Sequence, residues 1–221
     1  MSMAKQPLTV ELLCTEATAF AAIQAQTPRP DMYLRTIPKG VGTAMEKEFR
    51  AHLQANYNFV PGHSSKGVDF PGIGVDVKAT LITRPQSSCR FTSVDQKVYG
   101  LGYDLLVFLY RKRDDKDQKT AFLKIEKTVF VCKKQTGDHT LTRILLADLQ
   151  TGANKEDLIS TMRSKYLALT DEEADKLGDR LLREPPLQGY IGISPAQQWR
   201  LRYRKAAEYA GQVEGVLDLT K

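Results

Sequence analysis

The sequence of 221 residues has little cysteine and no long apolar run. Its three cysteines, Cys14, Cys89 and Cys132, lie far apart and include no CxxC pair, which argues against a disulfide framework and a zinc site. No apolar run approaches the ~18 residues of a membrane span, and the first residues lack the apolar centre of a signal peptide. We therefore expect a cytoplasmic protein with reduced cysteines.

Repeats, low-complexity tracts and Gly/Ser-rich linkers are also absent, so no domain boundary is visible. We expect residues 1–221 to form a single domain. A composition of 42% hydrophobic and 26% charged residues is typical of a globular protein with a sizeable core. The 32 Lys and Arg outnumber the 26 Asp and Glu, and the net charge of +6 favours a polyanionic partner.

The apolar patterning predicts an α/β (α+β) domain in which helices flank a central mixed β-sheet. The run 103–112 is almost wholly apolar, which is typical of a strand covered on both faces at the centre of a sheet. Ser194 before Pro195 is a good helix start. The predicted helices cover about 8–25, 43–58, 92–101, 141–149, 154–169, 171–182 and 194–211, and the predicted strands lie within 68–82, 103–112, 120–134 and 189–193.

Two acids and a lysine interrupt an otherwise apolar stretch at 69–82. Side chains alternate across a strand, so Asp76 and Lys78 project from the same face. We expect Pro71, Gly72 and Gly74 to form a tight bend that brings Asp69 alongside them. An Asp-x-Lys pair can also be a solvated surface ion pair, but charges inside an apolar strand are costly without a task.

Two adjacent carboxylates repel each other unless a cation lies between them. Hard oxygen ligands of this kind suit Mg²⁺, for which Mn²⁺ is a substitute. With a lysine nearby, such a centre can hydrolyse a phosphodiester, because the metal activates water and the ammonium offsets charge on the phosphate. We therefore predict Asp69 and Asp76 as catalytic metal ligands and Lys78 as a catalytic residue.

These residues resemble the PD-(D/E)XK nuclease signature, and most closely its MutH-like branch. That branch carries a Lys-Gly-x-x-Gly-x-x-x-Glu helix start and then an Asp-Phe…Leu-Gly-Val-Glu-Leu-Lys block, against which this chain has 39–46 (KGVGTAME) and 69–78 (DFPGIGVDVK). Lys-Gly is one residue nearer to the second glycine, Asp76 replaces the usual Glu, and Val68 stands where the signature has Pro. The resemblance covers 37–82 and implies a restriction-endonuclease-like fold.

By this resemblance Glu46, on the helix before the site, is a further catalytic acid that helps to hold the metal or its water. Glu48 is the competing residue. Helical spacing favours Glu46, which shares a face with Gly42, Phe49 and Leu53, whereas Glu48 lies nearer the outer side.

Basic residues are unevenly placed. Residues 111–134 carry nine Lys or Arg against four acids, and residues 195–209 carry four against one. Within the helical C-terminal part, 140–221, the predicted helix would place Gln197, Arg200 and Arg204 on one face, and Arg and Gln are the residue types that read guanine and adenine edges. The predicted DNA-binding residues are Lys39, Ser64, Ser65, Lys66, Gln96, Gln197, Arg200 and Arg204.

The sequence thus favours a Mg²⁺-dependent type II restriction endonuclease that hydrolyses double-stranded DNA at a short specific sequence. The first alternative is a MutH-like nicking or other DNA-repair endonuclease, which shares the site and differs in substrate. The second is a non-catalytic DNA-binding protein. A palindromic target would favour a homodimer, and a companion DNA methyltransferase is expected as a neighbouring gene rather than as a bound partner.

Overall fold

The computed structural model describes residues 5–36, 40–62, 67–89, 93–165, 168–194 and 200–220. These residues cluster into two compact units, each assembled from several stretches of the chain. Unit 1 comprises Met1–Pro85, Leu105–Phe130 and Leu217–Lys221, and unit 2 comprises Gln86–Asp104 and Val131–Val216.

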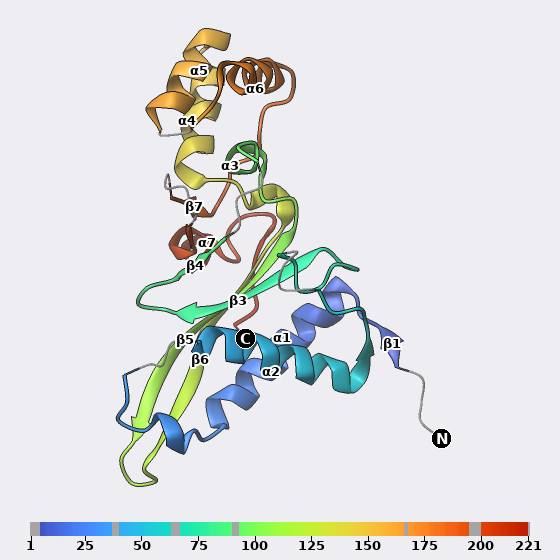
Figure 1. Cartoon of the computed structure of the whole chain (residues 1–221), viewed down its shortest axis with the longest axis vertical. Helices are drawn as coiled ribbons and strands as arrows, with labels where there is room; N and C mark the ends of the chain where they lie inside the picture. Colours follow the sequence, from blue (N-terminus) through green and yellow to red (C-terminus); the bar gives the residue numbers. More distant parts are fainter. Residues whose placement is uncertain are drawn as a thin grey trace. The chain divides into compact units, whose positions relative to one another are not determined.

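Unit 1 combines two long helices with the strands of a sheet. Helices α1 and α2, in blue in Figure 1, pack together, and α2 also packs on strand β3. The four-stranded sheet has the order β3-β5-β6-β9, and the short strands β1 and β2 pair in parallel. The elements are β1 (Gln6–Pro7), α1 (Val10–Gln26), the 3-10 turn Pro30–Met32, α2 (Val41–Asn56), β2 (Tyr57–Asn58), β3 (Val75–Leu81), β5 (Asp104–Asp115), β6 (Thr120–Val131) and β9 (Val216–Asp218).

The core of unit 1 follows from the apolar spacing of these elements. Strand β5 is buried without interruption from Leu105 to Tyr110, as expected for a strand covered on both faces. Phe20 of α1, Phe49 of α2 and Phe108 of β5 meet with ring centroids 5.1 to 5.6 Å apart. These rings fix the two helices against the middle of the sheet.

Unit 2 contains a helical cluster and a three-stranded sheet. Its helices share a core formed by Val94, Val98, Leu141, Leu145, Leu158, Met162, Leu177 and Leu181. The sheet has the order β4-β8-β7, and both of its pairings are antiparallel. The elements are β4 (Gln86–Ser88), α3 (Gln96–Tyr99), the 3-10 turn Lys133–Gln135, α4 (His139–Gln150), α5 (Lys155–Ser164), α6 (Asp171–Arg183), β7 (Gly192–Ile193), β8 (Arg200–Arg202) and α7 (Arg204–Tyr209).

The predicted fold class, a central sheet with flanking helices, is confirmed. The prediction of one continuous helix over 194–211 is wrong, because Arg200–Arg202 form strand β8 and the helix α7 begins at Arg204 and ends at Tyr209. Leu201 is completely buried between two exposed arginines, which is the alternation of a strand with one covered face. Within the described ranges, no helix is long and apolar enough to cross a membrane.

Candidate active site

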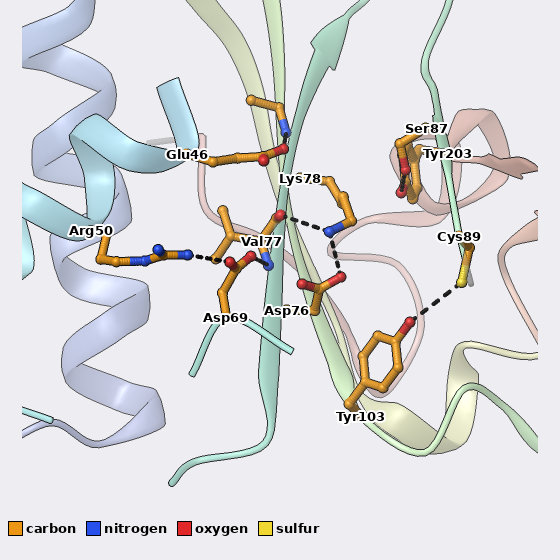
Figure 2. A network of polar contacts seen from close by, with 11 residues as sticks. Glu46, Arg50, Asp69, Asp76, Val77, Lys78, Ser87, Cys89, Tyr103 and Tyr203 are labelled. Atoms are coloured by element: carbon orange, nitrogen blue, oxygen red, sulfur yellow. Dashed lines mark hydrogen bonds and ion pairs between the residues drawn. The ribbon is translucent and has the colours of Figure 1, made fainter. Parts of the chain in front are cut away.

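A tight turn brings Asp69 next to the first half of β3. Phe70 and Val75 exchange backbone hydrogen bonds of 2.9 and 3.2 Å across residues 71–74, so the chain reverses directly after Asp69. The Asp69 carboxylate then accepts a hydrogen bond of 3.0 Å from the Val77 backbone N–H. The predicted bend is therefore present, and Asp69 lies beside the strand that carries the other two motif residues (Figure 2).

Asp76 and Lys78 lie on the same face of β3, as their spacing predicts. The Lys78 Nζ donates to the Asp76 carboxylate at 2.6 Å and to the Val77 carbonyl at 3.2 Å. Only 3% of the Asp76 side chain is exposed, against 19% for Lys78. This is a buried ion pair and not the solvated surface pair that an Asp-x-Lys strand often makes.

Glu46 reaches the same strand from helix α2. Its Oε1 accepts a hydrogen bond of 3.0 Å from the Ala79 N–H, one residue beyond Lys78. Gly42, one helical turn earlier, makes this approach possible, because a Cβ there would lie 2.3 Å from the Ala79 carbonyl oxygen. A glycine at position 42 thus lets α2 pack closely enough on β3 for Glu46 to reach it.

Glu48, the competing acid, belongs to a different contact. It pairs with Arg29 at 2.6 Å and accepts a hydrogen bond of 2.9 Å from the Gln24 side chain. It therefore ties α2 to the end of α1 and the residues that follow. This geometry is consistent with the prediction, made from helical spacing, that Glu46 and not Glu48 lies at the site.

Arg50 is a member of the cluster that the sequence prediction missed. Its guanidinium donates to the Asp69 carboxylate in a half-buried ion pair. Arg50 stands four residues after Glu46, so the two share a helix face, and this spacing was the available signal. We call the group of Glu46, Arg50, Asp69, Asp76 and Lys78 the α2–β3 corner.

Burial has the largest effect on the pKa values of Asp76 and Glu46 in this corner. It raises the pKa of Asp76 to about 7, an effect that the Lys78 ammonium reduces and the Asp69 carboxylate increases. Burial likewise raises the pKa of Glu46, against the opposing charge of Lys78. Burial alone would lower the pKa of Lys78, but the carboxylates around it, Asp76 first, raise it above its ordinary value. The lysine is thus held as an ammonium.

The donor set of the corner fits a hydrated divalent cation. Among the residues that the structure describes, no three acidic, histidine or cysteine side chains converge as a preformed metal shell. Mg²⁺ commonly takes only one or two carboxylates and keeps several waters. Three carboxylates face two cationic side chains here, and the buried Asp76 resists ionisation, so a cation beside Asp69 and Asp76 would offset the excess negative charge.

The predicted DNA-binding residues are scattered. Gln96 begins α3, and its amide donates to the Leu101 carbonyl at 2.9 Å. Arg200 is exposed on β8, and Arg204 is exposed at the first position of α7. The remaining predicted residues, Lys39, Ser64, Ser65, Lys66 and Gln197, lie outside the described residues.

Comparison with known proteins gives two matches of near full length. A family described as "Type II restriction enzyme NspV" matches residues 7–218. The curated type II restriction enzyme NspV of Nostoc sp. (strain ATCC 29411 / PCC 7524) is 46% identical over 210 residues, which cover 95% of this chain and 96% of that relative. No solved structure matches the chain significantly.

Proposed function

The chain belongs to the type II restriction enzyme NspV family, and we propose that it cleaves double-stranded DNA at a specific sequence with the α2–β3 corner as its active site. The observation that supports this site is the gathering of Asp69, Asp76 and Lys78 at one place. A buried carboxylate–ammonium pair in an apolar strand costs stability, and such a cost is typical of functional sites.

Enzymes of this type generally need a divalent metal ion, and we propose Mg²⁺ for this chain, with Mn²⁺ as a substitute. Asp69 and Asp76 would hold it through their carboxylate oxygens, supported by Glu46 from α2. A cation bound there supplies polarisation of the phosphoryl oxygen and a water of lowered pKa.

The side chains of the corner have distinct tasks in this scheme. Lys78, kept protonated by Asp76 and Glu46, places a positive charge where the phosphate gains negative charge during cleavage. Arg50 holds the Asp69 carboxylate from one side, and the Val77 N–H holds it from the other. Asp69 is therefore a positioned ligand that does not have to be ordered when DNA binds.

A palindromic target has two-fold symmetry, which favours a homodimer on DNA that presents one active site to each strand. A companion methyltransferase gene would protect the DNA of the host. We propose a cytoplasmic location, where DNA is the substrate of such an enzyme.

Digestion of supercoiled plasmid DNA by the full chain tests the function. With Mg²⁺ or Mn²⁺ we expect discrete linear fragments, and with a chelator we expect none. Open circles without linear fragments would instead support the nicking alternative. A gel shift without any cleavage would support the non-catalytic DNA-binding alternative and overturn the proposal.

A further inference from the structure

The three-stranded sheet of unit 2 presents two arginines on one exposed face. Arg200 and Arg202 are exposed on β8, with the buried Leu201 between them. In the register of the sheet Arg202 lies opposite Gln86, and Arg200 lies opposite Ser88, on the neighbouring strand β4. Directly paired residues share a face, and both β4 residues are exposed. We call Gln86, Ser88, Arg200 and Arg202 the arginine face.

The opposite face of this sheet fixes the register. Leu201 is paired with Ser87 on one side and with Ile193 on the other. The Ser87 hydroxyl and the phenol oxygen of Tyr203 form a hydrogen bond of 2.5 Å. Figure 2 shows the two side chains pointing toward each other. A slip of one residue would bury both arginines and expose Leu201, so the arrangement of the arginine face is strongly specified.

The two guanidinium groups have no acidic partner within the part of the chain that the structure describes. Arg29 and Arg50 differ in this respect, since Arg29 pairs with Glu48 and Arg50 with Asp69. No side chain lies beside Arg202 on β7, because its partner on that strand is Gly192. A Cβ at Gly192 would lie 3.2 Å from the Arg202 Cβ.

We propose that the arginine face reads base edges in the major groove of the DNA target, an inference that rests on the proposed function. Residues two apart on a strand are separated by ~6.8 Å, which matches two base-pair steps of ~3.4 Å. Arg200 and Arg202 can therefore reach base pairs two steps apart. Gly192 of β7 adds no side chain beside Arg202, so at this level the side chains of the face come from β4 and β8. A pair of strands fits a major groove ~12 Å wide.

The side-chain types on this face favour base edges over phosphates as the contacts. Arg makes two hydrogen bonds to guanine, Gln makes two to adenine, and Ser pairs with either. The positive charge of the face also complements the polyanion. Contacts to phosphate alone would instead strengthen binding to every sequence equally.

Cleavage selection on random DNA tests this inference. The full chain with Mg²⁺ is incubated with duplexes that carry a randomised centre, and the cut ends are sequenced to obtain the preference at each position. The variants are Arg200→Ala and Arg202→Ala, with Gln86→Ala as a test from the neighbouring strand. Arg183→Ala, which removes an exposed guanidinium from α6 of the same unit, is the matched control. Circular-dichroism melting curves confirm folding.

Each arginine variant should relax the preference at its own position by about 10- to 100-fold, and the two positions should lie two base pairs apart. The control should keep the wild-type preference. An unchanged preference in the arginine variants, with cleavage unaltered or uniformly lower, would overturn base reading by the arginine face, and so would a complete loss of cleavage; either result would leave the proposed function standing. A wild-type protein that cuts no DNA would overturn the proposed function itself.

Discussion

The α2–β3 corner and the arginine face use charge in opposite ways. In the corner every ionised side chain faces an opposite charge, and Asp76 is almost completely buried. On the arginine face two exposed guanidinium groups have no acidic neighbour among the described residues. Ion pairs inside the protein hold charged groups in fixed positions for catalysis. An exposed charge without a partner remains available to interact with a ligand. Substitutions in the corner should therefore reduce cleavage, whereas substitutions on the arginine face should change the sequence preference.

The largest effect is expected from Asp76→Ala. This change removes a proposed metal ligand and leaves Lys78 without its 2.6 Å partner. Loss of several kcal/mol of charge stabilisation should lower cleavage by about 10³-fold or more. Sequence-specific binding, which we assign to the arginine face, should persist in a gel shift. Asp117→Ala, at an exposed acid in the β5–β6 turn, is the matched control. Full cleavage by Asp76→Ala would remove the corner from the mechanism.

The pH dependence of the free energy of unfolding should distinguish the buried Asp76 from the exposed Arg200 and Arg202. In the folded protein without metal the pKa of Asp76 is about 7, against 3.8 for an ordinary Asp. Between these values the folded state binds more protons than the unfolded state, so the Asp76 contribution to the free energy of unfolding falls as pH rises. The total loss is roughly 4 kcal/mol.

Thermal unfolding in excess chelator measures this effect. The melting temperature of the wild type should fall relative to that of Asp76→Asn as pH rises from about 4.5 to 7.5. Added Mg²⁺ should stabilise the wild type more at pH 7.5 than at pH 4.5, because it binds the ionised carboxylate. Arg202→Ala should follow the wild-type pH curve. Parallel curves for the wild type and Asp76→Asn would contradict the burial of an ionisable Asp76.

A smaller effect separates the two acids of α2. Glu46→Gln should lower cleavage by about 10- to 100-fold, as expected for a supporting group of a metal site. It should not lower the melting temperature, because burial already penalises the charge of Glu46. Glu48→Gln should leave cleavage unchanged and cost about 1–3 kcal/mol through its pair with Arg29. Cleavage assays and melting curves on the two variants give the comparison, and the reverse pattern would assign the supporting role to Glu48.

These differences also explain what the sequence could predict. Asp69, Asp76 and Lys78 stood out because charge interrupts an apolar strand, and the turn residues before β3 placed them together. Glu46 followed from helical spacing together with the family resemblance. The long helices and the buried strand β5 were predicted because their apolar periodicity is strong.

The arginine face could not be predicted in the same way. The run Arg-Leu-Arg at 200–202 is compatible with either a helix or a strand, and a capping Ser-Pro before it favoured a helix. The strand forms because Leu201 pairs with Ser87, about 115 residues earlier in the chain, and such long-range pairing overrides local propensity. The partnership of Arg50 with Asp69 was missed because an arginine on a helix has many available partners.

The smallest expected effect concerns the close approach of Gly192 to Arg202 on the arginine face. Gly192→Ala adds one methyl group beside Arg202, with its Cβ 3.2 Å from the Arg202 Cβ. Because the backbone fixes the position of a Cβ, strand β8 must yield locally at Arg202 by a few tenths of an ångström, at a cost of about 0.5–1 kcal/mol. Cleavage selection should then show a loss of about 2- to 5-fold in preference at the position read by Arg202 and none at the position read by Arg200. Equal losses at both positions would mean that the sheet itself has shifted, and the space beside Arg202 would then have no separate role in recognition.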